Sequence, residues 1–193
     1  TILEIDLGIL IKIPAHGRFV LLGSLGVFLP NKDVKKRLLE LHIDVCGDFN
    51  FGESYVLIEG RLRDSHIVGI PLTGGFAFVL DWGSSPKFLL SVGGYHPRYE
   101  KPVRFPEIPR LTALIKKGDS LRLSCKYYQA ITSNSFQIGL SAEIVYKKGK
   151  AKAYGFLGFN ALLQFDPFYF ETDIKISVSV TYRGRSFIGV DME

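Results

Sequence analysis

Strict alternation of two residue sets between 168 and 182 constrains this chain more than any other feature. One set is mostly apolar and consists of Phe168, Phe170, Thr172, Ile174, Ile176, Val178, Val180 and Tyr182. The residues between them are Tyr169, Glu171, Asp173, Lys175, Ser177, Ser179 and Thr181. A helix would scatter both sets around its circumference, whereas a strand places each set on one face. We therefore predict a strand with the apolar set buried and with Glu171, Asp173 and Lys175 facing water or a polar lumen.

The same period of two recurs along the chain, for example at residues 3–13 and 135–146. Short glycine-bearing links such as 147–150 and 183–185 separate the alternating segments, as is typical of hairpins. We predict an all-β fold of mostly antiparallel strands in a meander, which forms a large coiled sheet, a sandwich or a barrel. No long helix is expected, only a short turn near 32–37. The twelve predicted strands are 2–13, 18–29, 38–48, 54–64, 73–82, 87–95, 110–116, 120–130, 134–147, 151–165, 168–182 and 186–193.

The length of 193 residues and a hydrophobic content of 47% suit one domain with a sizeable core. A charged content of 22% excludes an ordinary disordered tail, and two cysteines exclude a disulfide scaffold. Cys46 and Cys125 either pair across strands or stay free. Both ends of the sequence have strand character and there is no initiator Met. We expect residues 1–193 to be a single β domain cut from a larger β-rich protein.

The net charge of +5 is concentrated in one segment, residues 97–127. Eight bases and three acids lie there, a difference of +5, so the rest of the chain is balanced. A charge excess this local does not fit a protein that coats nucleic acid, and we expect no nucleic-acid partner. The bases are Arg98, Lys101, Arg104, Arg110, Lys116, Lys117, Arg122 and Lys126.

A proline-rich basic connection at 97–109 is predicted to be the one long loop. It carries four of the nine prolines, and proline cannot donate to a central strand ladder. Long loops in compact domains are often functional, so we place a candidate site for an anionic ligand here. The alternative is a loop that packs on its own sheet through Tyr95 and Phe105, with solvated charges. The candidate binding residues are Tyr95, His96, Arg98, Tyr99, Lys101, Arg104, Lys116 and Lys117.

Catalytic and metal-binding signatures are absent from the sequence. There is no Gly-x-Ser-x-Gly elbow, no phosphate-cradling Gly-x-x-x-x-Gly-Lys-Ser/Thr loop, and no His-Glu-x-x-His or Cys-x-x-Cys pair. The four histidines are dispersed without ligand spacing. We therefore expect a protein that is not an enzyme and that holds no cofactor and no metal.

Three segments carry a resemblance to a known family. Residues 88–99, with the run Gly93-Gly94-Tyr95-His96-Pro97, are similar to a signature of domain-of-unknown-function family 6603, and residues 130–139 and 158–170 are similar to two later blocks of it. The resemblance covers the chain from about 21 to 189. It implies a β-rich part of a large microbial protein, and it supplies no catalytic residue, substrate or cofactor.

Three functions follow from these observations. The first is a non-catalytic structural or interaction module, whose partners are neighbouring β domains of the same polypeptide or another protein. The second is a lipid-facing or lipid-carrying sheet, an outer-membrane barrel or an apolar groove, because the segment 168–182 has one uncharged face. Residues 19–28 and 156–163 are apolar on both faces, which favours a sandwich over a barrel with a polar lumen. The third is a hydrolase with a site near the 95–110 loop, drawing on His96 and Asp81.

Overall fold

The computed structural model describes residues 2–11, 17–29 and 38–192, and strands take up 74% of it. The prediction of an all-β fold is therefore confirmed. The expected turn near 32–37 lies outside the described residues. The described part contains one 3-10 turn, η1 (Phe51–Glu53), and no helix with the length and apolar character that crossing a membrane requires.

Thirteen strands are present among the described residues where the sequence predicted twelve, because the short strand β5 (Ile70–Thr73) lies almost wholly in residues 65–72, which the prediction left between two strands. Gly74, with a φ of 144°, separates β5 from β6. The strands are β1 (Ile2–Ile11), β2 (Arg18–Leu29), β3 (Leu39–Asn50), β4 (Tyr55–Ile67), β5 (Ile70–Thr73), β6 (Gly75–Asp81), β7 (Lys87–Val92), β8 (Leu111–Lys117), β9 (Leu121–Thr132), β10 (Ser135–Lys148), β11 (Ala151–Gln164), β12 (Tyr169–Tyr182) and β13 (Arg185–Met192).

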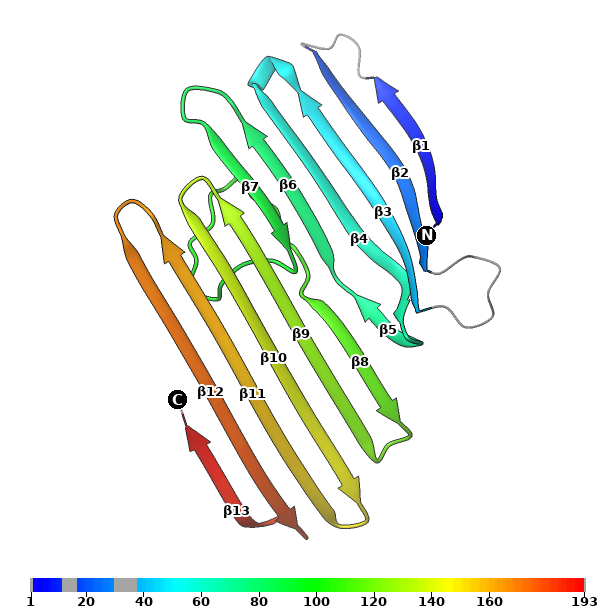
Figure 1. Cartoon of the computed structure of the whole chain (residues 1–193), viewed down its shortest axis with the longest axis vertical. Coiled ribbons are helices and arrows are strands. Elements are labelled where there is room, and N and C mark those ends of the chain that lie inside the picture. Colours follow the sequence, from blue (N-terminus) through cyan, green and yellow to red (C-terminus); the bar gives the residue numbers. More distant parts are fainter. Residues whose placement is uncertain (1, 12–16, 30–37, 193) are drawn as a thin grey trace.

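All strands belong to one antiparallel sheet with the order β1-β2-β3-β4-β5-β8-β9-β10-β11-β12-β13 (Figure 1). The hairpin β6–β7 lies off this path, because β6 pairs with β4 and β7 pairs with β9. β4 and β9 are long enough to hold two partners each along one edge, so β4-β5-β8-β9-β7-β6 form a ring of strands inside the sheet. The sheet is a meander on both sides of this ring.

One face of the sheet is apolar across its whole width, and we call it the apolar face. Residues directly opposite in an antiparallel ladder share a face, so Ile174, Phe159, Leu140 and Tyr127 form one row across β12, β11, β10 and β9. Exposed members of the face include Leu3, Ile5, Leu80, Leu90, Val92, Ile115, Ile131, Leu140, Ile144, Leu157, Phe170, Ile174, Val178, Ile188, Val190 and Met192.

The predicted burial of the apolar set in 168–182 is wrong for this chain. Phe170 is 58% exposed and Ile174 is 55% exposed, because among the described residues no second layer lies over the apolar face. The chain exposes 12447 Å² in all, against ~9,000 Å² for a compact protein of this size. Glu171 and Asp173 do lie on the face opposite Phe170 and Ile174, as predicted, although both side chains are only partly exposed.

Full burial occurs on the opposite face. Val79, Leu89 and Ala130, from β6, β7 and β9, are each 0% exposed. Tyr95 and Phe105 cover them from the connection between β7 and β8, residues 93–110, which we call the covering loop. The core of the domain is therefore a patch of sheet beneath a loop, and this matches the alternative in which Tyr95 and Phe105 pack on the sheet.

Truncation of Leu89 to alanine is expected to lower the free energy of unfolding by ~2–5 kcal/mol, because it opens a cavity under the covering loop. Ile174→Ala, on the exposed apolar face, is the matched control and should cost less than ~1 kcal/mol. Urea denaturation at low protein concentration measures both. Equal losses for the two variants would contradict this placement of the core.

Candidate functional site

The covering loop leaves β7 through two glycines that the geometry requires. Gly93 and Gly94 have φ values of 71° and 90°, a region that favours glycine. A Cβ at Gly93 would also collide with the backbone of Tyr127 and Leu111. The pair turns the chain back over the sheet, toward the start of β8 (Figure 1).

Arg110 and Gln137 fasten the loop from below. The Arg110 guanidinium donates to the carbonyl oxygen of Gly93 at 2.9 Å and to that of Tyr95, and it lies 3.9 Å from the centroid of the Tyr128 ring. Burial lowers the pKa of Arg110. The amide oxygen of Gln137, which is fully buried, accepts the His96 N–H at 2.8 Å. Each contact satisfies a backbone group that the loop would otherwise bury unpaired.

The aromatic side chains of the predicted site serve packing. Tyr95 stacks on Tyr99 with 5.8 Å between ring centroids, and its hydroxyl donates to the carbonyl oxygen of Pro106 at 3.0 Å. Burial raises the pKa of Tyr95, so the phenol stays protonated. Tyr95 and Tyr99 are therefore part of the loop's own core contact.

Three bases of the predicted site have acidic partners within the chain. Arg98 pairs with Glu171 of β12. Lys101 lies 3.0 Å from Glu107 and donates to the carbonyl oxygen of Phe105 at 3.0 Å. These contacts tie the loop to itself and to β12.

Arg104 joins the loop to two other elements, because its guanidinium lies 3.2 Å from Asp81 and 3.3 Å from Glu53. Asp81, which the hydrolase hypothesis joins to His96, therefore faces Arg104.

Lys116 and Lys117 lie at the far end of β8, ~20 Å along the strand from Arg110. The structure does not bring them to the other six residues, and anion binding by the loop stays a prediction.

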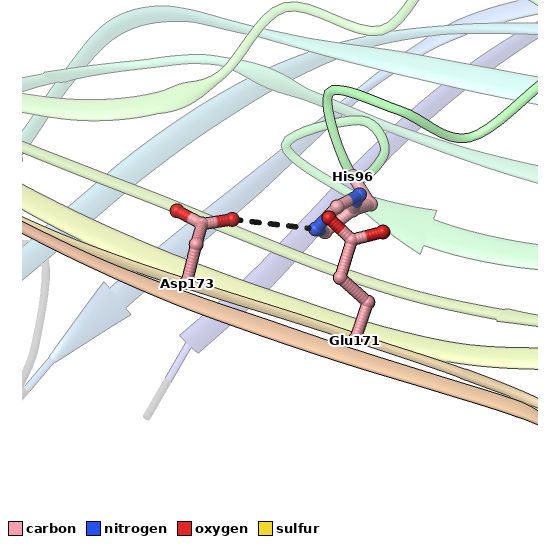
Figure 2. Close-up of side chains that lie close together, drawn as sticks. All are labelled: His96, Glu171 and Asp173. Carbon is pink, nitrogen blue, oxygen red and sulfur yellow. Dashed lines mark ion pairs between the residues drawn. The ribbon is translucent and has the colours of Figure 1, made fainter. Parts of the chain in front are cut away.

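The structure adds two residues that the sequence reasoning missed. Glu171 and Asp173, two positions apart on β12, meet His96 beneath the covering loop (Figure 2). The nearest Asp173 oxygen is 3.9 Å from His96 Nε2. Alternation does place both carboxylates on one face, but no local signal shows that a loop some 75 positions earlier lies over them.

His96 is neutral in this setting. Its burial lowers the pKa, an effect that outweighs the attraction of the Glu171 and Asp173 carboxylates. Its Nδ1 accepts the Arg98 N–H at 3.2 Å, so the proton of the neutral ring sits on Nε2. The ring thus directs an N–H at two carboxylates that lie beyond hydrogen-bonding reach.

A cavity of about 210 Å³ opens beside this cluster. Arg110 and Lys126 bring positive charge to its lining, and Asp173 belongs both to the cavity and to the cluster around His96. A small ligand in the cavity would therefore meet both cationic side chains and a carboxylate. Other lining residues are Pro97, Tyr128, Asn160 and Lys175.

The two cysteines are free, so the alternative in which Cys46 and Cys125 form a disulfide is wrong. Cys46 lies on β3 and Cys125 on β9, on different sides of the ring of strands. Burial raises the pKa of the Cys46 thiol, which disfavours a reactive thiolate.

Comparison with known proteins gives one match. The chain matches the family model described as "Family of unknown function (DUF6603)" over residues 1–193, and the resemblance drawn from the sequence is confirmed. No curated protein and no solved structure matches the chain.

Replacement of Gln137 by leucine is expected to release the covering loop, because the buried His96 N–H would lose its acceptor. The loss of free energy of unfolding should be ~1–3 kcal/mol, and exchange of the His96 amide hydrogen should accelerate. Gln129→Leu is the control, since Gln129 accepts only the Tyr127 hydroxyl among the contacts the structure gives it. Unchanged protection of the His96 amide in Gln137→Leu would contradict the role of Gln137.

Proposed function

We propose that this chain, which belongs to the family of unknown function DUF6603, is a non-catalytic structural module that binds a second apolar β-sheet through its apolar face. The observation that carries the proposal is the exposure of that face. Soluble proteins seldom leave more than a few hundred Å² of contiguous apolar surface open, and larger patches mark interaction sites. A neighbouring β domain, or another copy of this chain, offers a partner of the same chemistry.

The size of the apolar face fits a stable interface. Strands of up to 14 residues across the sheet give a face of roughly 2,000 Å². Two such faces together bury ~4,000 Å², within the range of obligate interfaces. Two stacked sheets lie ~10 Å apart with interdigitating side chains, an arrangement that aliphatic side chains such as Leu140 and Ile174 suit.

Charge is confined to the rim of the apolar face. The charged residues that the described register places on it are Lys117, Lys148 and Arg185. Each stands at the first or last residue of its strand, where it reaches water without crossing the interface. A face with an uncharged centre and a charged margin has the anatomy of a protein interface.

A second sheet is favoured over lipid because the opposite face is not a polar lumen. That face holds the packed core of Val79, Leu89 and Ala130 beneath the covering loop. It also buries Phe28 of β2 and Leu162 of β11. A transmembrane barrel shows an apolar band outside and a polar interior, whereas a sheet with apolar groups on both sides belongs between layers.

Lipid remains the second candidate for the apolar face, on one observation. Tyr146 and Tyr182 lie at the same end of β10 and β12, on the apolar face, as interfacial aromatics do in membrane proteins. The experiment below separates this candidate from a protein partner.

Sedimentation velocity of the purified chain tests the proposal. The wild-type chain is expected to sediment as a dimer or larger species at micromolar concentration. The double variant Leu140→Lys and Ile174→Lys should sediment as a monomer, because burying two ammonium groups in a sheet-on-sheet contact is unfavourable. The circular dichroism of both should stay that of a β protein.

The control variant carries Ser177→Lys and Ser179→Lys, which place the same charge on the opposite face of β12. It should associate as the wild type does. A wild-type chain that stays monomeric without detergent would contradict a second copy of this chain as the partner of the apolar face. Copurifying lipid, detected by mass spectrometry and lost in the Leu140→Lys, Ile174→Lys variant, would favour the lipid candidate instead.

A further inference from the structure

His96 carries a buried nitrogen that lacks a hydrogen-bond partner in the described part of the chain. Its side chain is 1% exposed, and Nε2 finds neither a donor nor an acceptor within bonding distance. The nitrogen faces the Asp173 carboxylate at 3.9 Å (Figure 2). Buried polar groups are nearly always bonded, so this exception needs an explanation, and a bound ion is one that the neighbouring carboxylates favour.

The cluster has the dimensions of a cation site. One ligand atom each from His96, Glu171 and Asp173 lies within 4.8 Å of the other two. Donors that share a Zn²⁺ ion sit ~2.0–2.2 Å from it, and so ~3–4 Å from one another. A contraction of about 1 Å would therefore close the three side chains on one ion, and the His96–Asp173 separation already falls within this range.

The carboxylates are already held in place by a second layer of contacts. Asp173 accepts from the Asn160 side-chain amide at 2.9 Å, and Asn160 in turn accepts the Tyr128 hydroxyl at 2.9 Å. Glu171 accepts the Tyr169 hydroxyl at 2.6 Å. Such outer contacts orient metal ligands and leave one Asp173 oxygen turned toward His96.

The charges around His96 leave room for a dication. Glu171 and Asp173 contribute two negative charges, and Arg98, at the solvent-facing side, balances one of them through its pair with Glu171. Arg110 also acts on His96 electrostatically, but it is committed to the carbonyl groups of Gly93 and Tyr95. The Arg98 side chain is 69% exposed and free to swing into water when a cation takes its place.

We infer that His96, Glu171 and Asp173 form a binding site for a divalent transition-metal cation that fastens the covering loop to β12. One imidazole nitrogen with two carboxylate oxygens suits Zn²⁺ or Mn²⁺ better than Ca²⁺ or Mg²⁺, which prefer all-oxygen ligand sets. Three protein ligands leave at least one coordination position for water or a ligand oxygen.

Coordination through Nε2 requires a change within the His96 ring. The neutral ring would move its proton to Nδ1, and the Arg98 N–H, which donates to Nδ1 at 3.2 Å, would have to turn away. Metal binding therefore moves the ring proton from Nε2 to Nδ1. It also breaks the contact of the Arg98 N–H with Nδ1 and the ion pair of the Arg98 guanidinium with Glu171. Nitrogen-15 chemical shifts of the ring report this exchange directly.

Calorimetric titration with ZnCl₂ tests the site in the full chain with Cys46 and Cys125 replaced by serine, because thiolates bind zinc themselves. One equivalent of Zn²⁺ should bind, with the tautomer exchange visible by NMR. His96→Asn and Asp173→Asn should each weaken binding at least ~10-fold. Arg98→Gln should strengthen it, because the competing guanidinium is gone.

His66→Asn is the matched control, a histidine outside the cluster, and should leave affinity unchanged. Equal affinity in His96→Asn and in the parent, or no binding of 1 mM Zn²⁺, would overturn the site. If circular dichroism shows that His96→Asn does not fold, the other two variants test the site. Weaker Zn²⁺ binding by Asp173→Asn and stronger binding by Arg98→Gln would support it. Unchanged affinity in both variants would overturn it.

Discussion

The packing of Tyr95 and Phe105 onto Val79, Leu89 and Ala130 is the contact on which the rest of the described structure depends. A single sheet layer cannot bury its own faces, since each face needs another element to cover it. The covering loop supplies that element for one face alone. The loop runs from β7 to β8 and packs on residues of β6, β7 and β9, so the ring of strands lies under the best-packed region of the sheet.

Four of the eight bases in the basic segment 97–127 lie in the same loop and have structural partners there. Arg98 and Arg104 reach acids on β12, β6 and η1, elements far from the loop in sequence. Exposed ion pairs contribute little individually, but a loop without strand hydrogen bonds needs several anchors to keep one position. The bases of the covering loop and the acids on β12, β6 and η1 thus form one set of contacts.

Much of the fold was predictable from alternation, because a period of two reports local geometry that each strand carries in its own sequence. The β12 strand and the glycine-bearing hairpin turns followed from it. Burial was not predictable, since Phe170 and Ile174 look the same whether a second layer covers them or not. The short strand β5, which pairs with β8, and the meeting of His96 with Glu171 and Asp173 depend on contacts between distant segments, which a periodic pattern does not encode.

β12 connects the two surfaces of interest, because its alternation places Ile174 on the apolar face and Asp173 on the face beneath the covering loop. Any layer that packs on Ile174 also restrains the backbone that carries Asp173 and Glu171. Strands hold ligating side chains more precisely than loops do, provided that the strand itself is rigid. A partner bound to the apolar face would therefore also affect the proposed cation site on the opposite face. By ordering β12, it would hold Glu171 and Asp173, two of the three proposed ligands, in position. Asn160 of β11, which donates to Asp173, would be held in the same way.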